Sequence, residues 1–462
     1  MKDIIKKLKE FAVESNKDLY IVGGYIRDKL MNSKRQPEDI DIVYEGDIKE
    51  IIDCMGLNSY GIYPLKAEMG IYRAVIMGKV VDISNLKGKN IEEDLSKRDF
   101  TVNAIALNLK NNLIIDPFEG RRHLANRVLK EVTKESISND RVRILRGIKM
   151  IIKSGMHFSA ETENTVRIES SYLKECTKER VFSEFMKIIS CDEFGEAFSV
   201  LDSYGVLKEL IPYVEEHKAI GRCKYHVEDA FTHMNASYKA FKELIRGDIK
   251  LDGLDLSILD RRVGEFNLQN YIAFGIFNHD IGKYSCYRKE SGKVSFLNHE
   301  KVGAKIINEF CDFWRFPKEG TRIITKLVQG HMYPLGLFKS NLKDYKKSFY
   351  KFFKKYEYVI PYILITSFCD MYATTIFINT YNEWEVYKKF LEKLFKEYEI
   401  YITVKGNPII HGDELKKIFN LKHREIGEAL SLVEEMNYRE LIESKEEAVN
   451  FLSKRCIINE NM

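Results

Sequence analysis

Two short stretches decide the fold of this chain: Gly23-Gly24-Tyr25-Ile26-Arg27-Asp28, and then Asp39-Ile40-Asp41-Ile42-Val43. The apolar residues before Gly23 predict a strand, and the glycine pair allows a tight turn whose backbone N–H groups can approach a phosphate. In the second stretch, polar and apolar residues alternate. On a strand, this alternation directs both carboxylates to one face and the isoleucines into a core.

The two carboxylates, Asp39 and Asp41, are candidate metal ligands. Carboxylates this close repel each other unless a cation lies between them. A pair of Mg²⁺ ions held by such oxygens can activate a hydroxyl group and stabilise a leaving pyrophosphate. A surface strand with an acidic edge is the alternative. The two stretches in this order favour the catalytic interpretation, with Mg²⁺ as the expected cofactor.

The composition indicates a globular chain of several domains. Its length of 462 residues suggests roughly three domains. The formal net charge is only +4, so a nucleic-acid site has to be local. The eight cysteines are scattered and form no Cys-x-x-Cys pair, which argues against a zinc knuckle or a disulfide framework. They favour a reducing compartment, and we expect a cytoplasmic protein. The charged start, MKDIIKKLKEF, predicts an amphipathic helix and not a signal peptide.

One apolar segment has the composition of a membrane span. Between Val359 and Asn382 the only charged residue is Asp370. Pro361 lies near the start of the segment, and an aspartate at the centre of a bilayer costs about 2.5–3.5 kcal/mol. The sequence therefore predicts a buried helix with one functional acid, in a soluble protein that contacts no membrane.

The chain divides by pattern into four stretches. Residues 1–120 predict an α/β head with a mixed sheet, because short apolar runs alternate with helical patterns. These runs cover residues 19–23, 40–44, 71–77, 80–83 and 104–109. Residues 121–220, 221–380 and 381–462 are predicted to be mainly helical, and we treat them as a neck, a further domain and a tail.

Additional polar residues accompany the apolar runs of the head. Asp82 is a candidate third carboxylate in a predicted strand, although a surface aspartate is the commoner case. Arg98, Asp99 and Asn103 group a cation, an acid and an amide before another apolar run. Arg98 can neutralise a triphosphate, and Asn103 can hydrogen-bond a ribose hydroxyl. An Arg–Asp pair that caps the strand is the alternative.

The clearest basic zone covers residues 121–153, with ten Lys/Arg against three acids. Within it, Asp140, Arg143 and Arg146 recur at i,i+3 spacing, which predicts one shared face of a helix. An aspartate and an arginine together offer acceptors and forked donors that suit the Watson–Crick edge of a base. A salt bridge on a solvated helix is the alternative.

The chain resembles the class II tRNA nucleotidyltransferase and bacterial poly(A) polymerase family. Over roughly the first 190 residues, six motifs stand in that family's order and spacing: GGYIRD, DIDIV, KRDFTVNAIAL, DPFEGRRHL, DRVRILRGIKM and Glu179-Arg180-Val181. In the tail, IHGDEL (410–415) and IGEAL (426–430) are similar to the family's C-terminal motif. Family members add nucleotides to a tRNA 3′ end without a nucleic-acid template.

The resemblance implies a nucleotidyltransferase fold for the head, a nucleotide-selecting and RNA-binding neck, and a tRNA-binding tail. It implies catalytic carboxylates at Asp39, Asp41 and Asp82, and nucleotide contacts at Gly23, Gly24, Arg27, Arg98, Asp99, Asn103, Asp140, Arg143 and Arg146. Asp140 and Arg143 would read the incoming base as a protein template. The expected partners are tRNA and CTP, with ATP left open, and no protein partner can be inferred.

Two departures from the family pattern concern nucleotide choice. Asn139 stands where the family usually has Glu. Full CCA-adding members carry a flexible loop of a few tens of residues between the third carboxylate and the Arg-Asp motif, whereas only fifteen residues separate Asp82 from Arg98. A deleted loop resembles members that add CC only. We therefore expect CC addition, with full CCA addition and poly(A) addition left open.

A second constellation lies in the middle of the chain: His233, His279-Asp280, His299, His331 and Asp370. A lone histidine on an apolar helix is usually a core residue, but imidazoles and carboxylates together bind a divalent metal and leave positions for water. His233, His279, Asp280 and Asp370 resemble the four signature positions of the HD phosphohydrolase superfamily, and Lys283 follows in its HDxGK form. The resemblance implies an HD domain in residues 221–380 with a divalent metal of unidentified kind.

Three functions compete. The first is a metal-dependent tRNA nucleotidyltransferase that releases pyrophosphate, with a poly(A) polymerase as a close alternative. The second is an HD phosphohydrolase that acts on RNA ends, with the head as a binding module. The third is an RNA-binding protein with a decayed head, and the intact Asp39/Asp41 pair argues against it. The lysine-rich and aromatic residues 339–355 fit RNA contact or a solvated lysine face over an aromatic core.

Overall fold

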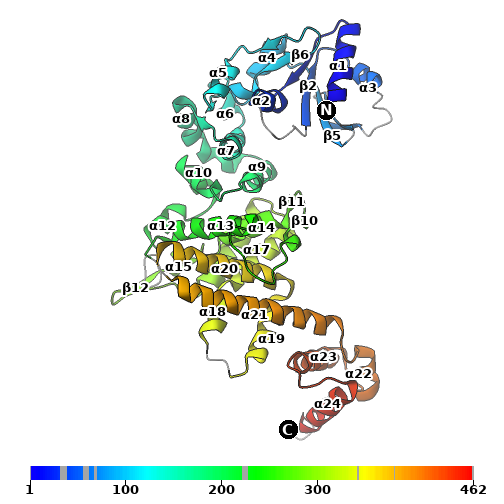
Figure 1. Ribbon diagram of the computed structural model, residues 1–462, viewed down its shortest axis with the longest axis vertical. Helices are drawn as coiled ribbons and strands as arrows, with labels where there is room; N and C mark the ends of the chain where they lie inside the picture. The colour runs from blue at the N-terminus through cyan, green and yellow to red at the C-terminus, as the bar shows by residue number, and fades with distance from the viewer. Residues whose placement is uncertain are drawn as a thin grey trace. The chain divides into compact units, whose positions relative to one another are not determined.

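The computed structural model describes residues 2–31, 39–55, 62–66, 70–76, 78–220, 227–340, 343–378 and 380–459 (Figure 1). The chain divides into two compact units, Met1–Cys191 with Ser199–Leu210 and Asp192–Phe198 with Ile211–Met462. Each unit is considered by itself. The four-stretch division expected from the sequence stays a prediction.

The first unit is built on a seven-stranded sheet in the order β3-β4-β5-β2-β1-β6-β7. β2 and β5 run parallel, and all other neighbours in this sheet are antiparallel, so the sheet is mixed. The strands are β1 (Leu19–Val22), β2 (Asp39–Tyr44), β3 (Ile62–Lys66), β4 (Ile71–Ile76), β5 (Lys79–Asn85), β6 (Ala106–Asn108) and β7 (Ile114–Ile115). The predicted runs fall on β1, β2, β4, β5 and β6, and Met77 lies outside the described residues.

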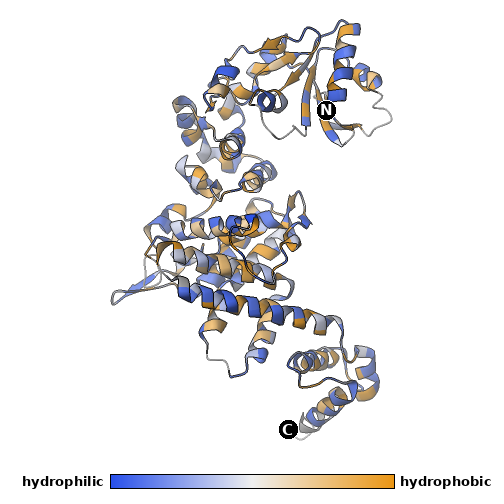
Figure 2. Cartoon of the chain, viewed as in Figure 1, coloured by the Kyte–Doolittle hydropathy of each residue, from blue (hydrophilic) through white to orange (hydrophobic). Residues whose placement is uncertain are grey.

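Both faces of this sheet are covered, which fixes the direction of its side chains. Ile40 and Ile42 are buried in a core shared with α1 and α3, while Val43 packs on the opposite face with Leu95 of α4. Figure 2 shows the corresponding mixture of hydrophobic and hydrophilic positions along the strands. Asp39 and Asp41 therefore lie on the α4 face, as the alternation predicts.

The helices of the first unit follow the strands and then form the rest of the unit. They are α1 (Lys2–Glu14), α2 (Gly24–Leu30), α3 (Ile48–Cys54), α4 (Ile91–Ser96), α5 (Gly120–Ala125), α6 (Ser136–Asn139), α7 (Arg143–Ser154), α8 (Ala160–Glu169), α9 (Lys178–Cys191), α10 (Ala197–Ser203) and α11 (Leu207–Leu210), with α10 crossing into the second unit. A short pair, β8 (Val128–Leu129) and β9 (His157–Phe158), joins this region.

One detail of the helix prediction is wrong. Asp140 is not on the helix that carries Arg143 and Arg146, because α6 ends at Asn139 and α7 begins at Arg143. Asp140 has φ −150° and ψ 89°, an extended conformation that interrupts the helix. The backbone N–H of Arg143 still bonds to the carbonyl of Asp140, at 3.0 Å. The aspartate thus precedes the first turn of α7.

The second unit is helical, apart from two short hairpins. Its helices are α12 (Val214–Ala219), α13 (Ala230–Arg246), α14 (Leu268–Phe277), α15 (Lys283–Cys286), α16 (His299–Phe313), α17 (Lys318–Gly330), α18 (Met332–Lys339), α19 (Tyr345–Tyr356), α20 (Ile360–Phe377), α21 (Tyr381–Gly406), α22 (Gly412–Phe419), α23 (His423–Tyr438) and α24 (Lys445–Asn459). The hairpins are β10 (Arg262–Val263) with β11 (Phe266–Asn267), and β12 (Arg288–Glu290) with β13 (Lys293–Ser295). The last three helices pack around a cluster of their own.

Helix α20 is a core helix of the second unit. The stretch Tyr345–Phe377 is long and apolar enough to cross a membrane, but most of it is buried inside the molecule. α20 packs against α13, α14, α17 and α21 and is buried along most of its length. This packing agrees with the predicted buried helix, and Asp370 is the acid that the helix carries.

Helix α19 separates its lysines from its aromatic residues. Phe349, Tyr350, Phe352, Phe353 and Tyr356 are buried, whereas most of the lysines on the helix are exposed. Of the two interpretations of residues 339–355, a lysine face over an aromatic core describes the packing. These five rings are therefore not available for stacking on RNA bases, whereas Tyr345 at the start of the helix is exposed.

The predicted fold class is confirmed. A head with a mixed sheet is followed by a mainly helical remainder, as the change from strand to helix patterns indicated.

Candidate functional site

A row of facing residues crosses the sheet of the first unit. Asp41 on β2 is paired with Asp82 on the parallel strand β5 and with Val22 on β1. Asp82 is paired in turn with Arg73 on β4. Paired residues on adjacent strands direct their side chains to the same face of a sheet, so Arg73 and the two carboxylates are neighbours.

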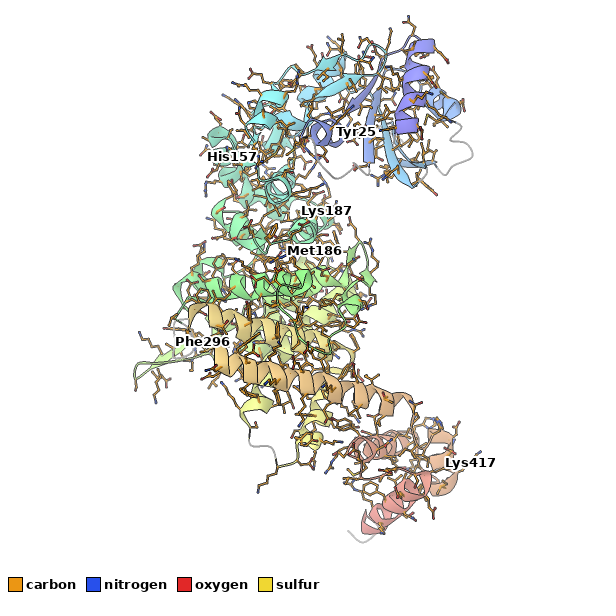
Figure 3. All side chains as sticks on the ribbon, viewed as in Figure 1. Tyr25, His157, Met186, Lys187, Phe296 and Lys417 are labelled. Carbon is orange, nitrogen blue, oxygen red and sulfur yellow. The ribbon has the colours of Figure 1, made fainter. Side chains whose placement is uncertain are left out.

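The turn after β1 lies directly against Asp41. Gly23 has φ +72°, and a Cβ atom there would lie 2.9 Å from Asp41 Oδ2 and 3.2 Å from Arg98 Nη1. Only a glycine tolerates both this backbone conformation and this close approach. α2 then begins at Gly24, with Tyr25 and Arg27 in its first turns (Figure 3). The glycine turn, a carboxylate and a guanidinium, all candidate site residues from the sequence, thus meet at one point.

Asp41 lies in a cluster of charges. Burial raises the pKa of its carboxyl group, the Arg98 guanidinium opposes this rise, and the Asp39 and Asp82 carboxylates add to it. Asp41 is half-buried, while Asp39 at the start of β2 is exposed. A cation between them would relieve the repulsion and the burial cost together. The side chains therefore fit a divalent cation.

Asp82 has a partner that the sequence did not suggest. Arg73 Nε and Nη2 donate to the two oxygens of Asp82 at 2.7 and 2.8 Å. Both oxygens of Asp82 therefore accept hydrogen bonds from Arg73, and neither is reserved for a metal ion. Arg73 could have been found only from strand register, because nothing in its local sequence marks it.

A chain of polar contacts connects α2 to α7. Arg27 Nη1 donates to Asn103 Oδ1 at 2.7 Å, and Asn103 Nδ2 donates to Asp99 Oδ1 at 2.9 Å. Arg146 Nη2 lies 3.1 Å from Asp99 Oδ2. Burial acts to raise the pKa of Asp99, but Arg146, Asn103 and the Phe100 N–H together lower it. Asp99 is therefore a buried anion that orients Asn103 and Arg146.

Arg143 and Asp140, the two residues expected to read the base, contact different groups and not chiefly each other. The Arg143 guanidinium donates to three backbone carbonyls, those of Lys97 at 2.7 Å, Arg98 at 2.9 Å and Ser136 at 3.0 Å. Its Nε lies 4.0 Å from Asp140 Oδ2. Asp140 Oδ2 instead accepts from Arg180 Nη2 at 2.7 Å. Arg180, part of the Glu179-Arg180-Val181 motif, had no site role in the sequence prediction.

The connection between β5 and Arg98 is short and is held by internal hydrogen bonds. β5 ends at Asn85, and α4 already begins at Ile91. The Lys87 N–H donates to Asp94 Oδ1 at 3.0 Å, and Lys97 Nζ donates to the Lys87 carbonyl at 2.5 Å. Asp94 Oδ2 also lies 3.3 Å from Arg98 Nη2. No long loop occupies residues 86–97, all of which the structure describes.

In the second unit, the four predicted HD residues come together from three elements. His233 is on α13, His279 and Asp280 directly follow α14, and Asp370 is on α20. His233 Nε2 lies 2.8 Å from Asp370 Oδ1. His279 Nε2 lies 3.2 Å from Asp280 Oδ2 and 3.6 Å from Asp370 Oδ1.

Charge makes this cluster a credible metal site. His279 Nε2 is buried and faces two carboxylates, with Asp280 Oδ2 at 3.2 Å and Asp370 Oδ1 at 3.6 Å. Burial acts to lower the pKa of His279, but Asp280 and Asp370 raise it to about 10. The pKa values of Asp280 and Asp370 stay well below the usual range despite burial, because Lys283 and the histidines offset it. The carboxylates thus require positive charge, which a divalent cation can supply.

Two more histidines lie beside this group. His299 begins α16 and His331 follows α17, and their Nε2 atoms are 3.2 Å apart. Both appeared in the sequence constellation but outside the four residues assigned to the metal. Burial and the neighbouring His279 and His299 lower the pKa of His331 to about 3, so its ring is neutral near pH 7. A neutral imidazole is the form that binds metals.

The fold and the first site together define a nucleotidyltransferase head followed by helical domains. The description "Poly A polymerase head domain" matches residues 19–89 and 68–130, and "Probable RNA and SrmB-binding site of polymerase A" matches residues 155–218. Residues 19–130 are therefore similar to the head of poly(A) polymerases, and residues 155–218 to the RNA-binding segment of that family.

Several relatives carry tRNA-related names. The chain is 25% identical to a "CC-adding tRNA nucleotidyltransferase" of Thermus thermophilus over 96% of this chain and 95% of that protein. It is 26% identical to an "A-adding tRNA nucleotidyltransferase" of Deinococcus radiodurans over 68% and 69% of the two chains. Among solved structures, a CCA-adding enzyme in complex with CTP is similar with a TM-score of 0.66 and 20% identity, over 98% of this chain and 95% of that one. This last likeness is evidence for the fold alone.

A substitution at Gly23 tests the close approach of the turn to Asp41. In Gly23→Ala, the new methyl group would displace Asp41 or Arg98 in an already strained backbone, at a cost of about 1–3 kcal/mol. We expect nucleotide addition to fall by about 10- to 100-fold, while the melting temperature falls by only about the few degrees per kcal/mol that such strain implies. The matched variant Gly24→Ala meets only Arg27 Nη2 at 3.6 Å and should lose clearly less activity. Equal losses in both variants would contradict this role of Gly23.

Proposed function

We propose that this protein is a tRNA nucleotidyltransferase that transfers CMP from CTP to the 3′ end of tRNA and releases pyrophosphate. The observation that carries this proposal is the meeting of Asp41 with the Gly23 turn and Arg98. In the reaction, the 3′ oxygen of the RNA forms a bond to the α-phosphorus as the bond from that phosphorus to the pyrophosphate oxygen breaks. Since tRNA is the substrate, we expect the protein in the cytoplasm.

The side chains have separate tasks in this proposal. Asp39 and Asp41 would hold Mg²⁺, which lowers the pKa of the attacking hydroxyl and neutralises the leaving pyrophosphate. The backbone at Gly23 and Gly24 and the Arg98 guanidinium would bind the phosphates. Arg27 is held by Asn103 at 2.7 Å, so both are oriented before the nucleotide arrives. Pre-orientation lowers the cost of binding.

The preference for CMP rests on the short connection after β5. A change from CTP to ATP requires the base-selecting groups to move, and a mobile segment that reaches them can drive that movement. Here residues 86–97 are bonded to themselves and, through Arg143, to the start of α7. The relatives include both CC-adding and A-adding enzymes, so their names do not decide between CMP and AMP. The argument for CMP therefore depends on the short connection at residues 86–97. A poly(A) polymerase is the alternative.

The first test uses tRNA transcripts that end before C74, C75 or A76, each with a single nucleoside triphosphate. We expect efficient addition of two CMP residues and poor addition of AMP. The hydrogen-bonded segment 86–97 cannot move far enough to reposition the base-selecting groups. Asp41→Ala should abolish all addition without loss of tRNA binding. AMP addition as fast as CMP addition would defeat the CC assignment, and an active Asp41→Ala protein would defeat the catalytic assignment.

Two mutants can separate the residue that selects the base from the residue that holds the segment before α7 in place. We propose that Asp140 reads the cytosine edge, with Arg180 as its neighbour, and that Arg143 holds residues 97 and 98 in the free enzyme. Asp140→Ala should then lose about 1–3 kcal/mol of discrimination between CTP and the other nucleotides. Arg143→Ala should slow all four nucleotides alike. Measurement of kcat/KM for each nucleotide distinguishes the two, and blurred choice in Arg143→Ala would assign base reading to Arg143, as the resemblance implies.

A second activity is favoured by the buried cluster in the second unit. We propose that His233, His279, Asp280 and Asp370 bind a divalent metal and that the unit hydrolyses phosphate esters at RNA ends or on nucleotides. Lys283 Nζ lies 2.6 Å from Asp280 Oδ2, in a position to meet a phosphate oxygen. A purely structural cluster would not need a buried histidine nitrogen that faces two carboxylates, because such groups are costly to bury.

This activity should be independent of the head. We expect hydrolysis of 2′,3′-cyclic or 3′-phosphate ends that a chelator inhibits, that survives Asp39→Ala and that is lost in His279→Ala. His423→Ala, which removes an exposed histidine of the same unit, is the matched control. Phosphate release and bound metal are measured for each protein. If the wild-type protein binds no transition metal and hydrolyses neither substrate, the proposed activity is wrong.

A further inference from the structure

The row of facing residues that crosses the sheet of the first unit extends to its edge strand. Beyond Asp41 and Asp82, Arg73 on β4 is paired with Tyr63 on β3, which is the edge of the sheet. Paired residues direct their side chains to the same face. The next residue of β4, Ala74, is buried in the core shared with α1 and α3. Arg73 and Tyr63 therefore lie on the opposite face, together with the carboxylates.

This end of the row is open at the surface. Tyr63 is 60% exposed, and Val75, which follows Arg73 on the same face of β4, is 45% exposed. The Arg73 side chain is itself 44% exposed. An exposed aromatic ring beside an arginine suits single-stranded RNA, because the ring can stack on an unpaired base and the guanidinium can bind a phosphate.

The Arg73 guanidinium is oriented with donors to spare. Its Nε and Nη2 donate to the two oxygens of Asp82 at 2.7 and 2.8 Å. These bonds leave the two N–H groups of Nη1 and one of Nη2. In the part of the chain that the structure describes, Nη1 has no hydrogen-bond partner. A phosphate group can therefore bind to Arg73 while its pair with Asp82 persists.

Arg73 also supplies charge where RNA would otherwise be repelled. The hydrogen bonds to Asp82 raise the pKa of Arg73, burial opposes this rise, and the Asp82, Asp39 and Asp41 carboxylates add to it. The guanidinium thus interacts with all three carboxylates, which together repel a phosphodiester. Arg73 offsets this repulsion on one side of the carboxylates, as Arg98 does at the glycine turn on the other side.

The direction of the reaction favours RNA at this end of the row. In phosphoryl transfer, the attacking and leaving oxygens lie roughly in line on opposite sides of the phosphorus. The proposed function puts the leaving pyrophosphate at the Gly23 turn, next to β1. The attacking oxygen then approaches from the side of β5 and β4, because the strand order is β3-β4-β5-β2-β1.

The distances along the row fit the end of an RNA strand. Arg73 is two strands and Tyr63 three strands away from Asp41, roughly 10 and 14 Å at about 4.8 Å per strand. Successive stacked nucleotides of one strand are about 3.4 Å apart. Both side chains are therefore within reach of the last few nucleotides of a strand whose 3′ oxygen lies at the carboxylates.

We propose that Tyr63 and Arg73 bind the 3′-terminal nucleotides of the RNA acceptor strand, with a base stacked on the Tyr63 ring and the adjacent phosphodiester on the Arg73 guanidinium. This proposal rests on the proposed CMP transfer and names the residues that hold the attacking strand. The incoming nucleotide is the alternative occupant, because its base would also stack on a tyrosine. The two occupants differ in the substrate whose KM the two side chains control.

The test compares full-length Tyr63→Ala and Arg73→Gln with the conservative variant Tyr63→Phe and the matched control Lys17→Ala. Lys17 is a partly exposed cation of the same unit that also donates to both oxygens of a carboxylate, that of Glu50, at 2.7 and 2.6 Å. KM is measured for tRNA and for CTP. Fluorescence anisotropy gives Kd for a tRNA transcript that ends in C74 and for the same transcript without its last few nucleotides. Melting temperatures close to that of the wild type confirm that the variants are folded.

We expect KM for tRNA and Kd for the longer transcript to rise about tenfold in Tyr63→Ala and in Arg73→Gln, the effect of losing one base stack or one charged phosphate contact. KM for CTP should not change. Tyr63→Phe keeps the ring and should bind as the wild type does, as should Lys17→Ala. All proteins should bind the shortened transcript alike. Arg73→Gln also alters the surroundings of Asp82, so Kd and not kcat is the decisive readout for this variant.

The outcomes are distinct. Unchanged binding of the longer transcript by Tyr63→Ala would overturn the proposal. A rise in KM for CTP alone would assign the row to the incoming nucleotide, and a loss of binding that persists on the shortened transcript would move the contact elsewhere on the RNA. Either result also overturns the proposal. A wild-type protein that binds the transcript but adds no CMP would instead contradict the proposed function, because binding is measured without the reaction.

Discussion

The close approach of the Gly23 turn to the Asp41 carboxylate is the constraint on which the first unit depends. A Cβ atom at residue 23 would lie 2.9 Å from Asp41 Oδ2, so the turn can pass there only because the residue has none. The same row of the sheet brings in Asp82 and Arg73 through strand pairing. Burial and the neighbouring Asp39 and Asp82 carboxylates raise the pKa of Asp41, so the geometry gathers negative charge that a divalent cation can offset.

The residues between β5 and Asp99 contact both the site around Asp41 and the start of α7. Arg143 bonds to the carbonyls of residues 97 and 98, and Arg146 pairs with the buried Asp99. Each contact is modest by itself, since a hydrogen bond to a charged group contributes about 1.5–3 kcal/mol. Together they connect residues 97–99 to the helix that follows Asp140. These contacts favour a single arrangement of this region, which is consistent with the proposed preference for CMP.

Much of the head could be predicted from local pattern, because its signals are short in range. The Gly23-Gly24 pair and the alternation at 39–43 each specify a conformation within a few residues, and β1 and β2 form there. Asp82 as a neighbour of Asp41 could be expected, but its bidentate bond to Arg73 depends on the register of β4, which no local pattern fixes. The i,i+3 spacing of Asp140 and Arg143 failed as a helix signal, because the chain is extended at Asp140. Spacing cannot reveal such a break when the polar residues alone are considered.

The buried cluster shows a different limit of sequence reasoning. The adjacent His279-Asp280 pair is a local signal, whereas His299 and His331 are isolated histidines whose meaning depends on which helices pack together. Their common feature is a Nδ1 bond to a backbone carbonyl three residues earlier, an arrangement visible only in three dimensions. That bond turns the Nε2 atom of each histidine toward Asp280, so three buried imidazoles surround one carboxylate. A core that needed only packing would fill this position with apolar side chains at lower cost. The retained polarity is therefore consistent with the cation proposed for this unit.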